Sequence, residues 1–494
     1  MSDYNSAADI AEKQLEKISP TMCYAKWAQV SLHLTNGKTH SCYHPPTHDI
    51  DVEEIKTNPS AIHNTKQKKI ERSMMLNGER PEGCSYCWNI EDAGGRSDRI
   101  YRSGEYWAQN ARKDIIASTE TGNVNPRYVE VNFNQACNFK CSYCSPHLSN
   151  TWEEEIKKFG DYEIMDADQN YIAHNNLGYL EEVGLLPKKL SQKGNPYLNA
   201  FWEWWPELYK TLEVFRMTGG EPLMDSNTFK VLDYVYENPN AWLELSVTSN
   251  MCPPKGMFDK FLEKVKKLEE IQIWESPRFN PGSGNNWYVN MAVKNFALFV
   301  SLDSVGKQAE YIRHGLDYDV LTKNTNKFLE QTCNTTVTFI NTFNVLSLPK
   351  IKEYMAMILN YRTQYCRENQ GTKYIAIHDE YNTHPDFVVN PRQRIWFDVP
   401  LLRYPDWQTA QVLPDLEHYL TDAISFMKEN PVDDNFIGFY DFEIEKMERN
   451  LVFMKERECD PIAKTNFIKF FGQHDKRRGT NLLETFPELH GVEM

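Results

Sequence analysis

The stretch YVEVNFNQACNFKCSYCSP, residues 128–146, joins a predicted strand to a closely spaced group of thiols. Its first part, YVEVNF, alternates β-branched or aromatic residues with polar ones and predicts a half-buried strand. The loop that follows carries Cys137, Cys141 and Cys144. Thiolates are soft ligands suited to zinc or to an iron–sulfur cluster, so we interpret this loop as a metal-binding segment.

Apolar strands and helical segments alternate from about residue 126 onward. Five further strands are predicted, at 212–219, 243–250, 296–304, 335–343 and 373–380. Repeated strand–helix units predict a parallel sheet with right-handed crossovers. Six units indicate an α/β fold of the partial (β/α)6 barrel type, with functional side chains at the carboxyl ends of the strands.

The rest of the chain is arranged around this predicted barrel. A chain of 494 residues is long for one hydrophobic core, so several domains are expected. We predict a lead-in at 1–20, a small α+β domain at 21–125, the barrel at 126–390 with an insertion at 147–211, and a helical extension at 391–494.

Charge and hydropathy restrict the partners of the chain. It contains 54 Lys and Arg against 69 Asp and Glu, a net charge of −15. This balance argues against indiscriminate attraction to nucleic acid or to anionic lipid. The sequence shows neither an apolar run of about 18 residues nor the layout of a signal peptide. We therefore expect a cytoplasmic protein without a membrane or nucleic-acid partner, in which clustered cysteines serve metal binding or catalysis.

Three cysteines suit an iron–sulfur cubane with an open position better than a closed zinc site. A structural zinc site needs four ligands. A [4Fe–4S] cluster has four irons, so three cysteines leave one iron open for a substrate or cofactor. The alternative is a zinc site completed by His147 or by a distant residue.

The pattern Cys137-x-x-x-Cys141-x-Tyr143-Cys144 resembles the signature of the radical S-adenosylmethionine (SAM) enzymes. In that family SAM chelates the open iron, and its reductive cleavage yields a 5′-deoxyadenosyl radical that abstracts hydrogen from the substrate. The resemblance implies that the three cysteines are the catalytic cluster ligands. It also implies SAM as a cofactor and a flavodoxin-type or other reductase as electron donor.

The segment MTGGEPL, residues 217–223, closes the second predicted strand. Gly219 and Gly220 have no Cβ, so the backbone there can pass close to a ligand. The segment resembles the GGEP segment that holds the SAM amino group in the family, where Glu221 would accept a hydrogen bond from the ammonium. The alternative is a tight turn before a helix with Pro222 near its start.

Other strand ends carry polar residues that resemble further SAM contacts. Arg313 resembles the Arg that pairs with the SAM carboxylate, for which a guanidinium fork is the favoured geometry. Its alternative is a surface ion pair with Glu310. In full, the resemblance implies SAM contacts by Tyr143, Thr218, Gly219, Gly220, Glu221, Ser249, Ser301, Asp303 and Arg313.

A second set of cysteines precedes the barrel. Two of them flank a predicted hairpin that turns at Asn36-Gly37, and two form a Cys-x-x-Cys knuckle. Such a set can close a tetrahedral zinc site. Its spacing also resembles the auxiliary-cluster half of the SPASM and twitch domains of radical SAM enzymes that modify peptides, although here it precedes the core. The resemblance implies an auxiliary [4Fe–4S] cluster on Cys23, Cys42, Cys84 and Cys87.

Three functions follow from these patterns. The first is a radical SAM enzyme that acts on a peptide or protein side chain. The second is a radical SAM enzyme for a small metabolite, nucleotide or sugar, which Trp202, Trp204 and Trp205 would stack against. The third is a non-enzymatic zinc-binding scaffold. As substrate contacts or proton-transfer groups we name residues that follow the sixth predicted strand, His378, Glu380 and His384.

Overall fold

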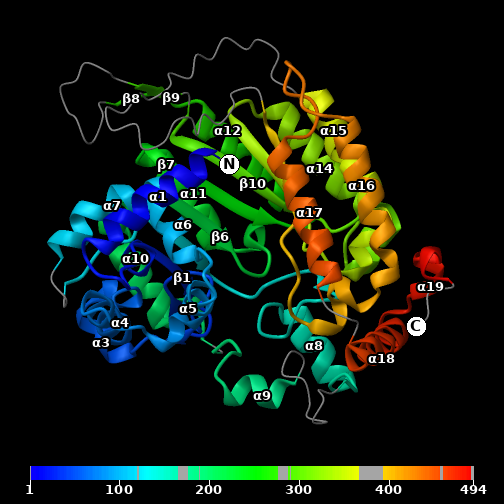
Figure 1. Ribbon diagram of the computed structural model, residues 1–494, viewed down its shortest axis with the longest axis horizontal. Coiled ribbons are helices and arrows are strands. Elements are labelled where there is room, and N and C mark those ends of the chain that lie inside the picture. Colours follow the sequence, from blue (N-terminus) through cyan, green and yellow to red (C-terminus); the bar gives the residue numbers. More distant parts are fainter. Residues whose placement is uncertain are drawn as a thin grey trace.

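The computed structural model describes residues 2–118, 122–164, 176–188, 190–275, 287–289, 291–365, 393–456 and 460–490. Its centre is a nine-stranded sheet in the order β13-β12-β10-β7-β6-β4-β1-β2-β3 (Figure 1). The strands of this sheet are β1 Gln29–His33, β2 Lys38–His40, β3 His48–Asp49, β4 Tyr128–Asn132, β6 Val214–Thr218, β7 Asn240–Ser249, β10 Val293–Ser301, β12 Thr335–Ile340 and β13 Ile395–Asp398.

Six neighbouring strands, β4, β6, β7, β10, β12 and β13, run parallel to one another. They follow one another in space in the order in which they occur in the chain, with helices in the connections. The chain is therefore a mixed α/β protein with a large parallel sheet. The helices of this part are α8 Asn150–Phe159, α9 Leu177–Glu182, α10 Pro196–Tyr209, α11 Ser226–Glu237, α12 Met257–Glu269, α13 Gly306–Ile312, α14 Tyr318–Gln331 and α15 Ile351–Tyr365. Two short ribbons stand apart, β5 Lys140–Cys141 with β11 Arg313–His314, and β8 Ile273–Glu275 with β9 Trp287–Val289.

The sixth parallel strand differs from the predicted one. It is β13, which pairs with β12 through Val337 and Ile395. Its four residues lie in the region 391–494, for which the sequence predicted a mostly helical extension. A strand this short, followed by Pro400, gives too little alternation to be recognised from the sequence. The predicted strand at 373–380 lies outside the described residues.

The predicted N-terminal hairpin is present and extends the central sheet. β1 pairs antiparallel with β2 and parallel with β4. Gly37 adopts the left-handed conformation, with φ of 73°, in the turn between β1 and β2, as the Asn-Gly signal indicated. The cysteine-bearing N-terminal region is thus joined to the parallel strands by backbone hydrogen bonds. Its helices are α1 Ser2–Glu16, α2 Ala25–Ala28, α3 Val52–Thr57, α4 Lys66–Leu76, α5 Ser85–Asp92, α6 Asp98–Gly104 and α7 Tyr106–Ala117.

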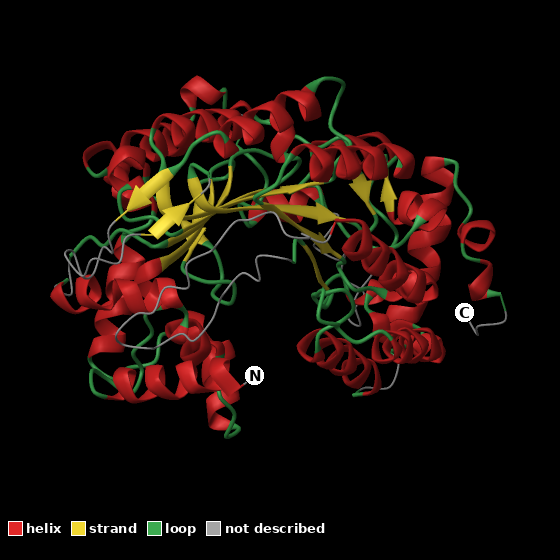
Figure 2. Cartoon of the chain, turned by 90° about the horizontal axis from the view of Figure 1, so that it is seen from above, coloured by secondary structure: helices red, strands yellow, loops and turns green. Residues whose placement is uncertain are grey.

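The two faces of the parallel sheet differ in polarity. Side chains alternate between the faces, so Phe215 and Met217 are fully buried while Arg216 between them is half-buried. Phe215 packs against Trp205 of α10, which places the apolar face under the connecting helices. Figure 2 shows the strands as an arch with helices along its outer side. The half-buried, polar residues line the inner side, which we call the concave face.

The predicted insertion supplies packing for the sheet. Trp204 and Trp205 on α10 are buried in the main core. Trp202 is half-buried, and its indole N–H donates to Asn227 Oδ1 at 3.0 Å. Trp204 and Trp205 are therefore core residues, and their burial does not support the stacking of a base or sugar on them.

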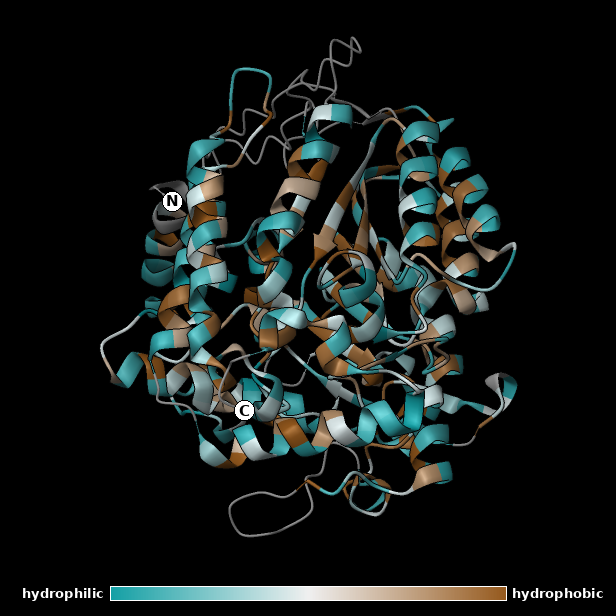
Figure 3. Ribbon diagram, turned by 90° about the vertical axis from the view of Figure 1, so that its right-hand side faces the viewer, coloured by the Kyte–Doolittle hydropathy of each residue, from teal (hydrophilic) through white to brown (hydrophobic). Residues whose placement is uncertain are grey.

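The C-terminal region is mostly helical beyond β13, and Figure 3 shows helices with both polar and apolar residues at this side of the molecule. None of the helices among the described residues is both long enough and apolar enough to span a bilayer. The C-terminal helices are α16 Glu417–Glu429, α17 Asp441–Lys455, α18 Pro461–Arg478 and α19 Leu482–Thr485.

Candidate functional site

The loop with the three cysteines follows β4 and is folded back by hydrogen bonds of its own backbone. The Cys137 N–H donates to Asn150 Oδ1 at 2.8 Å, at the start of α8. The Phe139 N–H approaches Cys137 Sγ at 3.4 Å, and the Cys144 N–H donates to the Cys141 carbonyl at 3.0 Å. All three thiols are half-buried. Donors aimed at sulfur favour its thiolate form.

Cys141 is held by a short ribbon and a cation. It lies on β5, directly opposite Arg313 on β11, and Arg313 Nη1 is 3.7 Å from Cys141 Sγ. The Trp152 indole N–H donates to the Cys141 carbonyl at 2.8 Å. Burial raises the pKa of the Cys141 thiol, and the positive charge of Arg313 opposes that rise.

The other two thiols lie in the same low-dielectric environment. Burial raises the pKa of Cys137 to about 12, and the neighbouring Cys141 adds to the rise. Burial raises the pKa of Cys144 further, again with a contribution from Cys141 and Cys137. A metal cluster would supply the positive charge that keeps such thiols ionised at neutral pH, so the donor set fits one.

The GGEP segment lies directly against the cysteine loop. A Cβ at Gly220 would stand 2.3 Å from the Ala136 carbonyl oxygen, and one at Gly219 would stand 2.4 Å from Asn132 Oδ1. Gly219 also has a φ of 119°, which L-residues with side chains rarely adopt. The Glu221 N–H donates to the Ala136 carbonyl at 2.7 Å. Only glycines allow this close approach of the two motifs.

Glu221 is buried, and its carboxylate is held by donors from the end of β7 and from its own turn. Its carboxylate accepts hydrogen bonds from Ser249 Oγ at 2.8 Å, the Asn250 N–H at 2.7 Å and the Leu223 N–H at 3.1 Å. Burial nevertheless raises its pKa to about 7. Glu221 also caps the short 3-10 helix Pro222–Met224. The tight turn with Pro222 near the start of a helix is therefore present together with the close contact to the cysteine loop.

Asp303, Arg313 and Tyr143 form one buried cluster. The Asp303 carboxylate accepts hydrogen bonds from Tyr143 Oη at 2.8 Å, Arg313 Nη2 at 3.1 Å and the Thr342 N–H at 2.8 Å. Arg313 is 6% exposed, and Glu310 pairs instead with Lys307 at 2.6 Å. The surface ion pair weighed for Arg313 is therefore wrong. This cluster fixes Arg313 beside Cys141.

The remaining predicted SAM contacts lie at strand ends. Thr218 ends β6 and Ser301 ends β10, and both are half-buried on the concave face. Ser249 ends β7 and is buried against Glu221. The predicted substrate residues His378, Glu380 and His384 lie outside the described residues.

Two asparagines that the sequence did not single out tie the cysteine loop to β7. The Asn138 side-chain amide donates to the Cys252 carbonyl at 2.6 Å. The Asn250 amide donates to Asn138 Oδ1 at 2.9 Å. The sequence signal is weak, since asparagines within a loop are common for reasons of turn formation alone.

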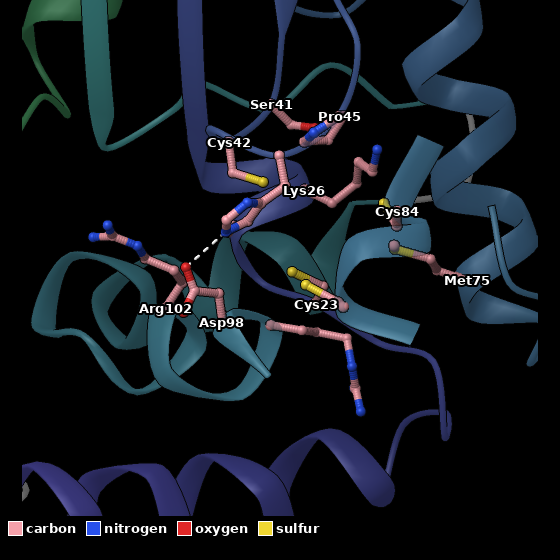
Figure 4. A pocket seen from close by; sticks show the side chains of 13 residues that line it. Cys23, Lys26, Ser41, Cys42, Pro45, Met75, Cys84, Asp98 and Arg102 are labelled. Atoms are coloured by element: carbon pink, nitrogen blue, oxygen red, sulfur yellow. Dashed lines mark hydrogen bonds and ion pairs between the residues drawn. The ribbon is translucent and has the colours of Figure 1, made fainter. Parts of the chain in front are cut away.

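The second set of cysteines lines one small pocket. Figure 4 shows that Cys23, Cys42 and Cys84 reach it from different segments. These segments are the turn before α2, the end of the hairpin after β2 and the start of α5; Cys87 also lines the pocket. Residues far apart in the sequence thus place four thiols around a single space, which fits a ligand set.

A buried lysine lies in the same pocket. Lys26 is 2% exposed, and its Nζ is 2.5 Å from Glu71 Oε2. Burial opposes the ammonium form, but interaction with Cys84, with the Glu71 carboxylate and with Cys42 raises the pKa of Lys26. A buried cation is stable only with compensating anions, and thiolates bound to a metal cluster would be such anions.

The described residues do not form a site for a single metal ion. No group of three or more His, Cys, Asp or Glu side chains in that part of the chain is placed to hold one. The His147 ring instead contacts the Ser145 hydroxyl through Nδ1. In the described residues, the structure therefore shows neither a zinc site nor a cluster site at either cysteine set. In a cubane each thiolate binds a different iron, so the thiols need not converge on one point.

Fold and site together define an α/β protein with two separate thiol sites attached to one sheet. No protein-family model matches the chain, and no curated protein matches it. Two solved structures are similar to it, SuiB of Streptococcus suis and the same protein bound to S-adenosylmethionine. Each is 14% identical with a TM-score of 0.28, and the match covers 77% of this chain and 73% or 74% of theirs. A likeness this distant decides neither fold nor function.

Proposed function

We propose that this chain is a radical SAM enzyme, with Cys137, Cys141 and Cys144 as ligands of a [4Fe–4S] cluster. The observation that carries the proposal is the contact between the cysteine loop and the GGEP segment, made by the Glu221 N–H and the Ala136 carbonyl at 2.7 Å. Two motifs more than seventy residues apart meet at the carboxyl ends of adjacent parallel strands, where functional groups gather in α/β folds.

Each motif has a distinct role in this proposal. The three thiolates would leave one iron of the cluster open, and Glu221, once its carboxyl is ionised, would accept a further hydrogen bond from the SAM ammonium. Its protein donors hold this carboxylate in one orientation. Tyr143 and Asp303 hold Arg313 beside Cys141. When bound, the reduced cluster and SAM supply a 5′-deoxyadenosyl radical for hydrogen abstraction.

We further infer an auxiliary [4Fe–4S] cluster on Cys23, Cys42, Cys84 and Cys87. The shared pocket and the buried Lys26 support it. Four protein thiolates leave no iron open there, so this cluster would relay electrons or contact substrate. We propose a peptide or protein side chain as substrate and a flavodoxin-type or other reductase as electron donor, in the cytoplasm. A small-metabolite substrate would keep the same chemistry.

Anaerobic reconstitution tests this function. The wild-type chain should bind about eight iron and eight sulfide, as expected for two cubanes, and form 5′-deoxyadenosine from SAM and dithionite. Cys141→Ala should abolish this cleavage. Cys333→Ala is the matched control, because Cys333 is exposed and belongs to neither set. Zinc without sulfide in the wild type, or full cleavage by Cys141→Ala, would refute the proposal.

A further inference from the structure

Arg216 occupies the middle of β6 and lies on the concave face of the sheet. Its guanidinium carbon lies 5.5 Å from the centre of the Tyr128 ring and 5.0 Å from that of the Phe299 ring. Two aromatic side chains on different strands therefore hold the planar group by cation–π contact. The side chain is half-buried, so the described residues do not cover it completely.

The hydrogen-bonding capacity of Arg216 is unused. No hydrogen bond or ion pair joins its guanidinium to any residue that the structure describes, although the group carries five N–H donors. Glu130 is its direct neighbour on β4, but the Glu130 carboxylate instead accepts a hydrogen bond from Tyr43 Oη at 3.3 Å. The Glu130 and Glu244 carboxylates lie near enough to interact with the Arg216 charge, but none of the described residues accepts a hydrogen bond from its guanidinium. A half-buried cation held by rings in this way can bind an external anion through those donors.

The position of Arg216 places such an anion between the two cysteine sites. Thr218, at the SAM end of the same strand, is two residues away, which is about 7 Å along a strand. On the other side, Tyr43 follows Cys42 in the sequence and contacts Tyr128 at the start of β4. A substrate that reaches both sites would therefore pass over Arg216.

We propose that Arg216 binds a carboxylate of the substrate, and that this selects an acidic side chain or a free C-terminus of a peptide. The inference rests on the proposed radical SAM function and adds a specificity-determining residue to it. A carboxylate can take two parallel N–H groups of the guanidinium fork. A doubly charged phosphate would suffer more repulsion from Glu130 on the neighbouring strand.

Peptide binding to the anaerobically reconstituted full chain, in the presence of SAM, tests this proposal. Three probes are compared: amidated random peptides with one Glu, the same library with Gln in its place, and the Gln library with a free C-terminus. The wild type should retain one of the two carboxylate libraries about tenfold over the amidated Gln library. The library that is enriched identifies the source of the carboxylate.

Substitutions at Arg216 supply the decisive comparison. Arg216→Met should abolish the preference, and Arg216→Glu should lower retention of the preferred carboxylate library below that of the amidated Gln library. Arg216→Lys keeps the charge and should retain only part of it, since an ammonium lacks the fork. Arg80→Met is the matched control, because Arg80 pairs with Asp92 at the surface.

Two outcomes overturn the assignment: equal retention of all three libraries by the wild type, or an unchanged preference in Arg216→Met. Should Arg216→Met fail to fold, a full preference in Arg216→Lys has the same meaning. Formation of 5′-deoxyadenosine by the same wild-type preparation reports separately on the proposed chemistry. Its absence overturns the radical SAM function, whereas its presence with equal retention overturns the role of Arg216 alone.

Discussion

Substitution of Gly220 by Ala tests whether SAM cleavage depends on the contact between the cysteine loop and the GGEP segment. The added Cβ would stand 2.3 Å from the Ala136 carbonyl oxygen and 2.7 Å from the Gln135 carbonyl carbon. Both atoms belong to the backbone of the cysteine loop and cannot rotate away. Because real Cβ contacts begin at 3.0–3.4 Å, the cysteine loop and the end of β6 must separate by roughly 1 Å. A displacement of about 1 Å in catalytic groups can reduce the rate about 100-fold.

The stability of the chain should change much less than its activity. Overpacking of this size costs about 1–3 kcal/mol, which a chain with this much buried core tolerates. We therefore expect Gly220→Ala to fold and to keep the iron of the auxiliary site, while SAM cleavage falls roughly 100-fold. The assay is 5′-deoxyadenosine formation per chain, measured with iron content and thermal unfolding on the same preparations.

Gly472→Ala is the matched control for this prediction. Gly472 lies within α18, and a Cβ there would meet nothing within 4 Å. The control should cleave SAM as the wild type does and be slightly more stable, by about 1 kcal/mol, because Ala favours a helix over Gly. Cleavage by Gly220→Ala within about twofold of the wild type would mean that the contact between the motifs does not position SAM.

Two further predictions concern buried charges. Burial raises the pKa of Glu221 from 4.5 to about 7, so the folded chain favours the neutral carboxyl. The free energy of unfolding of the metal-free chain should therefore fall by up to about 3 kcal/mol as the pH rises from 4.5 to 7. Denaturant unfolding across this pH range should show the fall in the wild type and in Glu237→Gln, whose substituted side chain is exposed. The fall should be absent in Glu221→Gln. An identical fall in Glu221→Gln would mean that another group causes the pH dependence. Lys26→Met removes the cation beside Cys84 and Cys42, which should lower the reduction potential of the proposed auxiliary cluster by on the order of 100 mV. Potentiometric titration followed by electron paramagnetic resonance measures this shift. Lys56→Met is the control, because Lys56 forms an exposed ion pair with Glu53. An unchanged potential in Lys26→Met would exclude an electrostatic role for Lys26.

The sequence predicted those parts of the structure that depend on local pattern. Five of the parallel strands and the hairpin at Gly37 were predicted because alternation and turn chemistry act over a few residues. The sequence also placed Tyr143, Asp303 and Arg313 among the site residues. It could not show that Asp303 binds the other two, because such pairings depend on the register between distant strands.

Arg216 illustrates the limit of sequence reasoning most clearly. Within LEVFRMTG it reads as an ordinary strand residue, and its alternation with Phe215 and Met217 says only that it faces away from the helices. Its two ring contacts come from Tyr128 and Phe299, one before it and one well after it in the chain. Its importance therefore appears only when the four neighbouring strands β10, β7, β6 and β4 are placed side by side.

The hairpin joins the cysteines that precede the parallel strands to the same sheet. β1 pairs in parallel with β4, so the two strands share one direction. The loop with Cys137, Cys141 and Cys144 follows the carboxyl end of β4, whereas Cys42 follows β2, which returns to the amino end of β1. The two sites therefore lie toward opposite ends of five-residue strands, which span about 17 Å.

This arrangement fixes the spacing of the two sites through strand hydrogen bonds and not through a flexible linker. Arg216 lies in the middle of β6, which pairs with β4 on the side away from β1. A substrate carboxylate bound there would be held at a depth set by the same ladder that positions both thiol sets. Joint action of the two proposed sites would therefore depend on the register between β1, β4 and β6. A shift of one residue in β6 would turn Arg216 away from the concave face.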